Sequence, residues 1–87
     1  MSAAKVEIYT QWGCPYCTHA IALLNSKGVA FEEYDTTLGG PKKAEMKERV
    51  PGACTVPQIL IGGVAVGGSD DLHALDRAGK LDALLGV

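Results

Sequence analysis

Two cysteines are separated by a proline and a tyrosine in the stretch W-G-C-P-Y-C, which covers residues 12–17. A pair at this spacing, here Cys14 and Cys17, either binds a metal or forms and breaks a disulfide. Alternating polar and apolar residues at 5–10 predict a strand before the pair, and apolar residues three and four positions apart predict a helix after it. A cysteine pair at such a strand-to-helix junction indicates thiol–disulfide redox chemistry.

The predicted helix start gives the two thiols different roles. Cys14 falls at the helix N-terminus, where unpaired backbone N–H groups and the helix dipole favour thiolate over thiol. Cys17 falls one turn later on the apolar face, where burial is expected to raise its pKa and keep it protonated. We therefore expect Cys14 to attack a substrate disulfide and Cys17 to resolve the mixed disulfide that results.

A zinc site is the main alternative for this pair. Structural zinc takes four ligands, usually from two separated pairs. The remaining cysteine and the two histidines of the chain are Cys54, His19 and His73, and His19 follows Cys17 by only two residues on a helix, so it points away. The spacing therefore disfavours zinc, and we expect no metal site. A permanent structural disulfide is also disfavoured, because so short a loop constrains the unfolded chain little.

The composition is that of an ordinary soluble globular protein, with 87 residues of which 47% are hydrophobic and 21% are charged. We expect one domain over residues 1–87, because the chain is too short for two separate cores. The net charge of −2 gives no electrostatic reason to expect nucleic acid or an anionic membrane as a partner. The N-terminus has no signal-peptide pattern, so a cytoplasmic location without a membrane partner is expected.

The remaining chain predicts the elements that position the cysteines. We expect a strand at 29–34, a short polar helix at 42–49, a hairpin of 58–61 with 64–66, and helices after Gly68 and near 81–85. The first two strands are joined through a helix and should be parallel, whereas the hairpin adds antiparallel strands. The predicted fold class is α/β, a mixed four-stranded sheet flanked by helices in the order β-α-β-α-β-β-α.

Three motifs, taken together, resemble the glutaredoxin family and in particular its small bacterial dithiol class. They are Cys14-Pro15-Tyr16-Cys17, Thr55-Val56-Pro57 and Gly67-Gly68-Ser69-Asp70-Asp71-Leu72. The similarity runs from about Lys5 to Leu85. Thioredoxins differ, since they carry Gly-Pro between the cysteines and a tryptophan directly before the first. The resemblance implies a thioredoxin-like fold and an enzyme, a glutathione-dependent thiol–disulfide oxidoreductase that uses glutathione as co-substrate and binds no cofactor.

The resemblance also implies a glutathione site. A cis Pro57 would leave the Val56 backbone free to pair with the cysteinyl part of glutathione. The amides of Ser69 and Asp70 at a helix start would hold the γ-glutamyl carboxylate, and the Asp70 side chain would pair with the ammonium group. The implied glutathione-binding residues are Gln11, Tyr16, Thr55, Val56, Pro57, Gly68, Ser69 and Asp70.

Two positions depart from the family pattern. Gln11 stands where many members carry a lysine that faces the glycyl carboxylate of glutathione, and Cys54 stands where some carry an arginine. We therefore expect fewer positive charges at that end of the site, and Lys42, Lys43 and Arg49 are the candidates to replace them. For Cys54, a small space-filling side chain is favoured over an accessible thiol open to glutathionylation.

The expected partners follow from the same resemblance. Disulfide-containing or glutathionylated proteins are the implied substrates, ribonucleotide reductase among them, and a monomer is the expected state. His19 and His73 are expected to be solvated helix residues rather than bases. Two alternatives stay open: a protein that carries an iron–sulfur cluster between two subunits, which Pro15 disfavours, and an enzyme that takes its electrons from thioredoxin reductase.

Overall fold

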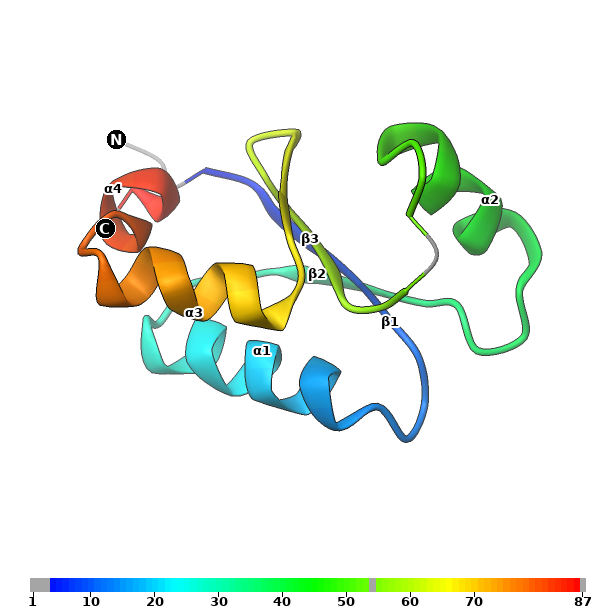
Figure 1. Cartoon of the computed structure of the whole chain (residues 1–87), viewed down its shortest axis with the longest axis horizontal. Helices are drawn as coiled ribbons and strands as arrows, with labels where there is room; N and C mark the ends of the chain where they lie inside the picture. The colour runs from blue at the N-terminus through cyan, green and yellow to red at the C-terminus, as the bar shows by residue number, and fades with distance from the viewer. Residues whose placement is uncertain (1–3, 54, 87) are drawn as a thin grey trace.

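The computed structural model describes residues 4–53 and 55–86, so Cys54 lies outside the described residues. The described elements follow the predicted order, including the short helix predicted near 81–85 (Figure 1). They are β1 (Val6–Thr10), α1 (Pro15–Ser26), β2 (Glu32–Asp35), α2 (Gly40–Arg49), β3 (Gln58–Ile61), β4 (Val64–Gly67), α3 (Ser69–Arg77) and α4 (Leu81–Leu85).

The strands form the predicted mixed sheet, in the order β2-β1-β3-β4. β1 pairs in parallel with β2 and antiparallel with β3, while β3 and β4 form the expected hairpin. Gly62 and Gly63 join this hairpin with positive φ angles of 60° and 82°, as a two-residue turn requires. β2 begins at Glu32, later than the strand predicted at 29–34.

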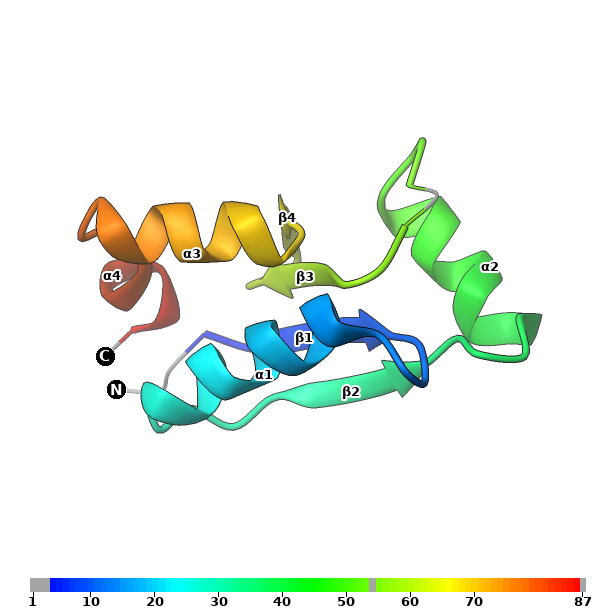
Figure 2. The same ribbon diagram turned by 60° about the horizontal axis from the view of Figure 1, so that its bottom comes forward.

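Helices cover both faces of the sheet, as the two views in Figures 1 and 2 show. On one face, α1, α3 and α4 enclose the larger apolar core, in which Val6 and Ile8 pack with Leu24. On the other face, Tyr9 and Leu60 pack with Met46 of α2. Because β1 is a central strand, all five of its residues are buried, including the polar ones.

An ion pair between Arg49 of α2 and the buried Glu7 of β1 connects α2 to the sheet. The Arg49 guanidinium donates to both carboxylate oxygens of Glu7, each at 2.7 Å, and the Tyr34 hydroxyl donates to the same carboxylate at 2.8 Å. The Glu7 side chain is only 6% exposed, and hydrogen bonding by Arg49 lowers its pKa to about 2. Arg49, one of the candidates to replace the missing positive charges of the site, is therefore already paired with Glu7 within the fold.

The two ends of the described chain lie side by side. The Ala4 N–H donates to the Leu85 carbonyl at 3.2 Å. Nearby, the Lys27 ammonium contacts Asp76 at 2.6 Å and Asp82 at 2.8 Å, which joins the end of α1 to α3 and α4. Figures 1 and 2 show both chain ends at the end of the molecule opposite to the start of α1.

Candidate active site

Cys14 occupies the N-cap of α1, as the sequence predicts, with Pro15 in the first turn. Its sulfur accepts a hydrogen bond from the Cys17 N–H at 3.2 Å. The Cys14 thiol also lies 3.8 Å from the Val56 carbonyl oxygen, to which it donates. This sulfur is partly exposed and receives a backbone N–H that the helix itself leaves unpaired, which stabilises a negative charge there.

Cys17 lies behind Cys14 and is buried, with 4% of its surface exposed. Burial, together with the hydrogen bond to Cys14, raises the pKa of the Cys17 thiol to about 12. The side chain therefore stays a neutral thiol near pH 7, as its place on the apolar face of the helix predicts. The two sulfurs differ in exposure, although they are one helical turn apart.

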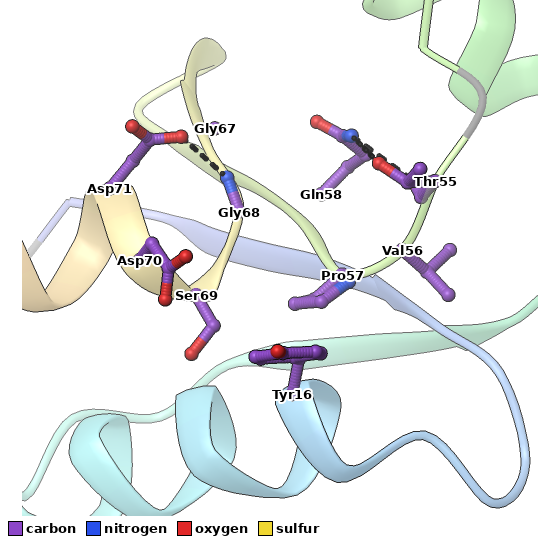
Figure 3. Close-up of a pocket in the computed structure, with 10 residues that line it drawn as sticks. All are labelled: Tyr16, Thr55, Val56, Pro57, Gln58, Gly67, Gly68, Ser69, Asp70 and Asp71. Atoms are coloured by element: carbon purple, nitrogen blue, oxygen red, sulfur yellow. Dashed lines mark hydrogen bonds between the residues drawn. The ribbon is translucent and has the colours of Figure 1, made fainter.

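A cleft of about 490 Å³ lies beside Cys14, between the first turn of α1, the segment before β3 and the start of α3 (Figure 3). Seven of the eight predicted glutathione-binding residues line it. They are Tyr16, Thr55, Val56, Pro57, Gly68, Ser69 and Asp70. The eighth, Gln11, is exposed and does not line the cleft, but its carbonyl accepts the Cys14 N–H at 3.3 Å.

Backbone from two separate segments comes close together in the cleft. The Val56–Pro57 bond is cis, as expected. Gly68 lies so close to this segment that a Cβ there would be 3.4 Å from the Pro57 carbonyl oxygen. Figure 3 shows Tyr16 next to Pro57, with Ser69 and Asp70 at the other wall. Backbone from two distant segments is thus brought together within reach of one ligand.

Sequence reasoning missed Asp71 as a residue that shapes the cleft. The Asp71 carboxylate accepts the Gly68 N–H at 3.1 Å and caps α3 (Figure 3). Gly67 has a φ of 111°, and a Cβ on it would lie 2.2 Å from an Asp71 carboxylate oxygen. An acidic residue three positions after Gly68 is a capping pattern that could have revealed Asp71. Gln58 also lines the cleft, and its amide donates to the Thr55 carbonyl at 3.0 Å.

Ser69 lines the cleft, and its hydroxyl contacts a histidine of the same helix. The residue is 5% exposed, and its hydroxyl lies 3.4 Å from Nδ1 of His73. The same nitrogen lies 2.8 Å from the Ser69 carbonyl oxygen. His73 was expected to be solvated, but it is half-buried and hydrogen-bonded to its own helix. His19 is exposed, as expected, and its ring packs edge-on against Tyr16.

The charged side chains that line the cleft are both acidic. Asp70 and Asp71 contribute carboxylates, and no lysine or arginine of the described residues is among the lining side chains. Lys42, one of the candidate cations, contacts Glu45 at 3.3 Å and the face of the Tyr34 ring. Over residues 4–53 and 55–86, the charged side chains that line the cleft are therefore all negative.

A model of the glutaredoxin family matches residues 6–66, which include both active-site cysteines and Pro57. The chain belongs to the glutaredoxin family. Glutaredoxins are thiol–disulfide oxidoreductases, and the cysteine pair of this glutaredoxin is its redox-active centre. The mixed sheet with helices on both faces is the thioredoxin-like fold that the sequence predicts.

Known glutaredoxins resemble this chain along almost its whole length. Glutaredoxin 3 of Escherichia coli (strain K12) is 54% identical over 82 residues, which cover 94% of this chain and 98% of that protein. The solution structure of glutaredoxin from Brucella melitensis is 54% identical, covers 98% of this chain and 91% of its own, and has a TM-score of 0.82. The buckwheat glutaredoxin–glutathione complex is 25% identical, covers 95% of this chain and 77% of its own, and has a TM-score of 0.79.

Within the part of this glutaredoxin that the structure describes, no group of three or more His, Cys, Asp and Glu side chains is arranged to hold a metal ion. None of the described helices is long and apolar enough to cross a membrane.

Proposed function

We propose that this glutaredoxin is a glutathione-dependent enzyme that reduces protein–glutathione mixed disulfides and protein disulfides. The observation that carries the proposal is the position of the Cys14 sulfur, 3.8 Å from the Val56 carbonyl on the wall of the cleft. The cleft volume of about 490 Å³ falls within the ~300–1,000 Å³ of typical small-molecule sites. The buckwheat relative, solved with glutathione, supports the same choice of ligand.

In the proposed site, glutathione binds along the cleft with its sulfur at Cys14. The Val56 backbone pairs with the cysteinyl residue, as one added strand residue does at a sheet edge. The first amides of α3, from Ser69 and Asp70, hold the γ-glutamyl carboxylate, because the start of a helix leaves its N–H groups unpaired. The Asp70 carboxylate pairs with the ammonium group, and Tyr16 covers the sulfur.

The other proposed contacts are supporting ones. Thr55 and Pro57 shape the segment that presents Val56, Gly68 lets the ligand approach the backbone, and Gln11 lies toward the glycyl end without a charge. We assign no metal or resident cofactor to the reaction, since two thiols and glutathione account for every electron transferred.

Reduction of a protein–glutathione mixed disulfide then needs Cys14 alone. Its thiolate attacks the glutathione sulfur, the protein sulfur leaves and takes up a proton, and a Cys14–glutathione disulfide remains. A second glutathione, as thiolate, attacks the glutathione sulfur of that disulfide. Oxidised glutathione leaves and the Cys14 thiolate is restored, so one glutathione is consumed for each protein thiol recovered.

Reduction of a protein disulfide uses both cysteines. The Cys14 thiolate attacks one substrate sulfur and the other leaves as a thiolate. Cys17 gives its proton to that departing thiolate and attacks the Cys14 sulfur, which releases the second protein thiol. The Cys14–Cys17 disulfide that remains is reduced by two glutathione molecules, which leave as oxidised glutathione.

The proposed setting is the cytoplasm, with the protein acting as a monomer on disulfide-containing or glutathionylated proteins. Ribonucleotide reductase is one such substrate implied by the family. Stable disulfides are rare in that compartment, so a disulfide formed during turnover has to be reduced again, and glutathione is the abundant reductant there.

The test is NADPH consumption with the mixed disulfide of cysteine and glutathione as substrate. One assay contains glutathione and glutathione reductase, and the other contains thioredoxin reductase alone. We expect turnover only in the first assay, and none in either assay with the Cys14→Ser variant. Turnover only with thioredoxin reductase would remove the glutathione site from the proposal while leaving the redox role of the cysteines in place.

A further inference from the structure

Two large apolar side chains next to the active site are almost fully exposed. Trp12 is 86% exposed and Leu38 is 98% exposed. Trp12, the one tryptophan of the chain, lies two residues before Cys14 in the loop between β1 and α1. Leu38 lies in the loop between β2 and α2. Single exposed apolar residues are common on protein surfaces. Two of them in neighbouring loops, one of which leads into the nucleophile, indicate a binding role.

Hydrogen bonds join these two loops into one frame. The Trp12 N–H donates to the Thr37 hydroxyl at 2.8 Å, and Leu38 is the next residue after Thr37. The N–H and hydroxyl of Thr36 both donate to the Thr10 carbonyl at 2.8 Å, and the Asp35 carboxylate accepts the Thr37 N–H at 2.8 Å. The backbone that carries the exposed side chains is therefore fixed, which lowers the entropy cost of binding.

These two loops, β1–α1 and β2–α2, lie on the side of Cys14 away from the proposed glutathione cleft. Figures 1 and 2 both show the two loops beyond the first turn of α1, on the side away from the start of α3. Neither Trp12 nor Leu38 is among the residues that line the cleft. A glutathione in the cleft would leave them exposed, whereas a polypeptide whose cysteine has reached Cys14 has to continue past it in some direction.

We propose that Trp12 and Leu38 form a docking surface for the polypeptide part of a protein substrate. The preferred occupant is a segment with apolar side chains next to its disulfide-bonded or glutathionylated cysteine. Trp12 precedes the reacting Cys14 by only two residues, its loop is hydrogen-bonded to the loop that carries Leu38, and tryptophan is among the residue types that most often dominate binding at interfaces. This inference rests on the proposed function, and it adds a selectivity among protein substrates that the cleft alone does not provide.

Two glutathionylated peptides test the inference, one with leucine and phenylalanine beside its cysteine and one with serines at the same positions. Trp12→Ala should raise KM for the apolar peptide about tenfold without changing kcat, the loss expected for an interface tryptophan. Leu38→Ala should raise the same KM about threefold, since it removes less apolar surface. For the serine peptide and for the cysteine–glutathione disulfide, both variants should stay within about twofold of the unchanged protein.

Val64→Ala is the matched control, because Val64 is 66% exposed at the far hairpin and should change none of these constants. Equal KM values for the two peptides on the unchanged protein, or an unaltered KM in Trp12→Ala, would overturn the docking surface. Failure of the small mixed disulfide to turn over with glutathione would instead overturn the proposed function.

Trp12 fluorescence gives a test that needs neither turnover nor a stable variant. The unchanged protein is titrated with the apolar peptide carrying serine in place of its glutathionylated cysteine. A saturable blue shift of the emission is expected, because the indole moves from water to an apolar contact, and the all-serine peptide should cause none. Emission that does not change with the apolar peptide would contradict docking at Trp12, whatever the kinetic outcome.

Discussion

The backbone N–H of Cys17 donates to the sulfur of Cys14 at 3.2 Å, so the residue that carries the second thiol also stabilises charge on the first. Cys17 presents its amide to Cys14 and keeps its own sulfur buried, with a pKa raised to about 12. A single helical turn thereby supplies one sulfur suited to attack and one that waits as a neutral thiol. This relationship makes the roles of the two residues separable by mutation.

Substitution of each cysteine should affect the two proposed activities differently. These activities are the reduction of glutathionylated proteins and the reduction of protein disulfides. Cys14→Ser should lower both the reduction of glutathionylated proteins and the reduction of protein disulfides by ~10³-fold or more, because the nucleophile is lost. Cys17→Ser should abolish the second activity and leave the first within about threefold. Rates are measured with a glutathionylated protein and with a disulfide-bonded protein. An equal loss of both activities in Cys17→Ser would contradict the assignment.

Burial should make Cys17 slow to alkylate. In a Cys14→Ser, Cys54→Ser double variant, iodoacetamide should modify Cys17 at pH 8 at least ~100-fold more slowly in the folded protein than in urea, because only the thiolate reacts. The rate should rise steeply only as pH approaches 12, and mass spectrometry follows it. Equal rates with and without urea at pH 8 would show that the pKa of Cys17 is not raised.

Local sequence patterns predicted where the two cysteines lie on α1, and the resemblance to glutaredoxins implied the residues that line the cleft. Pro15 after Cys14 marks a helix start, and the segment containing Val56 and Pro57 precedes a clear strand, so each piece could be recognised alone. Asp71 was missed although its spacing from Gly68 fits a capping pattern, and only its close approach to Gly67 needs the folded turn to be seen. Gln11 was expected in the site because many family members carry a lysine at its position, but Gln11 does not line the cleft.

Gly67→Ala should destabilise the protein by about 2–3 kcal/mol. Part of the cost is the positive φ, and part is the displacement of Asp71, which loses its cap on Gly68. Gly79→Ala is the matched control, because Gly79 also has a positive φ of 73° but nothing within 4 Å of a Cβ, and it should cost about 1 kcal/mol. Urea unfolding measures both variants.

A double variant isolates the contact from the backbone strain. In an Asp71→Ala background, Gly67→Ala should cost about 1 kcal/mol less than in the unchanged protein, because the crowded side chain is already gone. The same cost in both backgrounds would mean that only the backbone conformation matters at Gly67.

The ion pair of Glu7 and Arg49 shows where sequence patterns fail. An acidic residue between Val6 and Ile8 fits a strand with one polar face in water, and Arg49 fits an exposed helix end. Both patterns give the correct secondary structure, but not the burial of the Glu7 side chain. Neither pattern predicts that α2 packs on this face of β1. That packing brings together two charges that are 42 positions apart in the sequence.

Glu7 should make stability depend on pH in the acidic range. Its folded-state pKa of about 2 lies below the ordinary 4.5, so the ionised carboxylate stabilises the fold above pH 4.5, and this contribution disappears as pH falls toward 2. The difference corresponds to about 3 kcal/mol. Glu7→Gln should therefore lose about that much stability at pH 7 and much less at pH 2.5, as measured by urea unfolding.

Glu48→Gln on α2 provides the control for this measurement, because Glu48 is exposed and its loss should leave the pH profile almost unchanged. A Glu7→Gln variant with the same acid-induced loss of stability as the unchanged protein would contradict the assigned role of the ion pair.

Gln11→Lys should lower KM for glutathione about two- to fivefold. The substitution places a positive charge near a site whose lining charges are both acidic, and an exposed pair of this kind contributes up to about 1 kcal/mol. The gain should shrink as salt increases from 20 to 500 mM, because exposed charges are screened. Gln11→Met keeps the length without the charge and should give no gain. A salt-independent gain in both variants would point to a packing effect.

The meeting of Ala4 and Leu85 has a practical consequence for how the molecule can be handled. Both described ends lie at the end of the molecule opposite to the start of α1, where Cys14 is the N-cap residue (Figure 1). An affinity tag, a fluorescent protein or a solid support attached at either end would face away from incoming substrates. New ends could also be opened at the Gly62-Gly63 turn after linking the old ones by a few residues, which would give a circular permutant with the same active site.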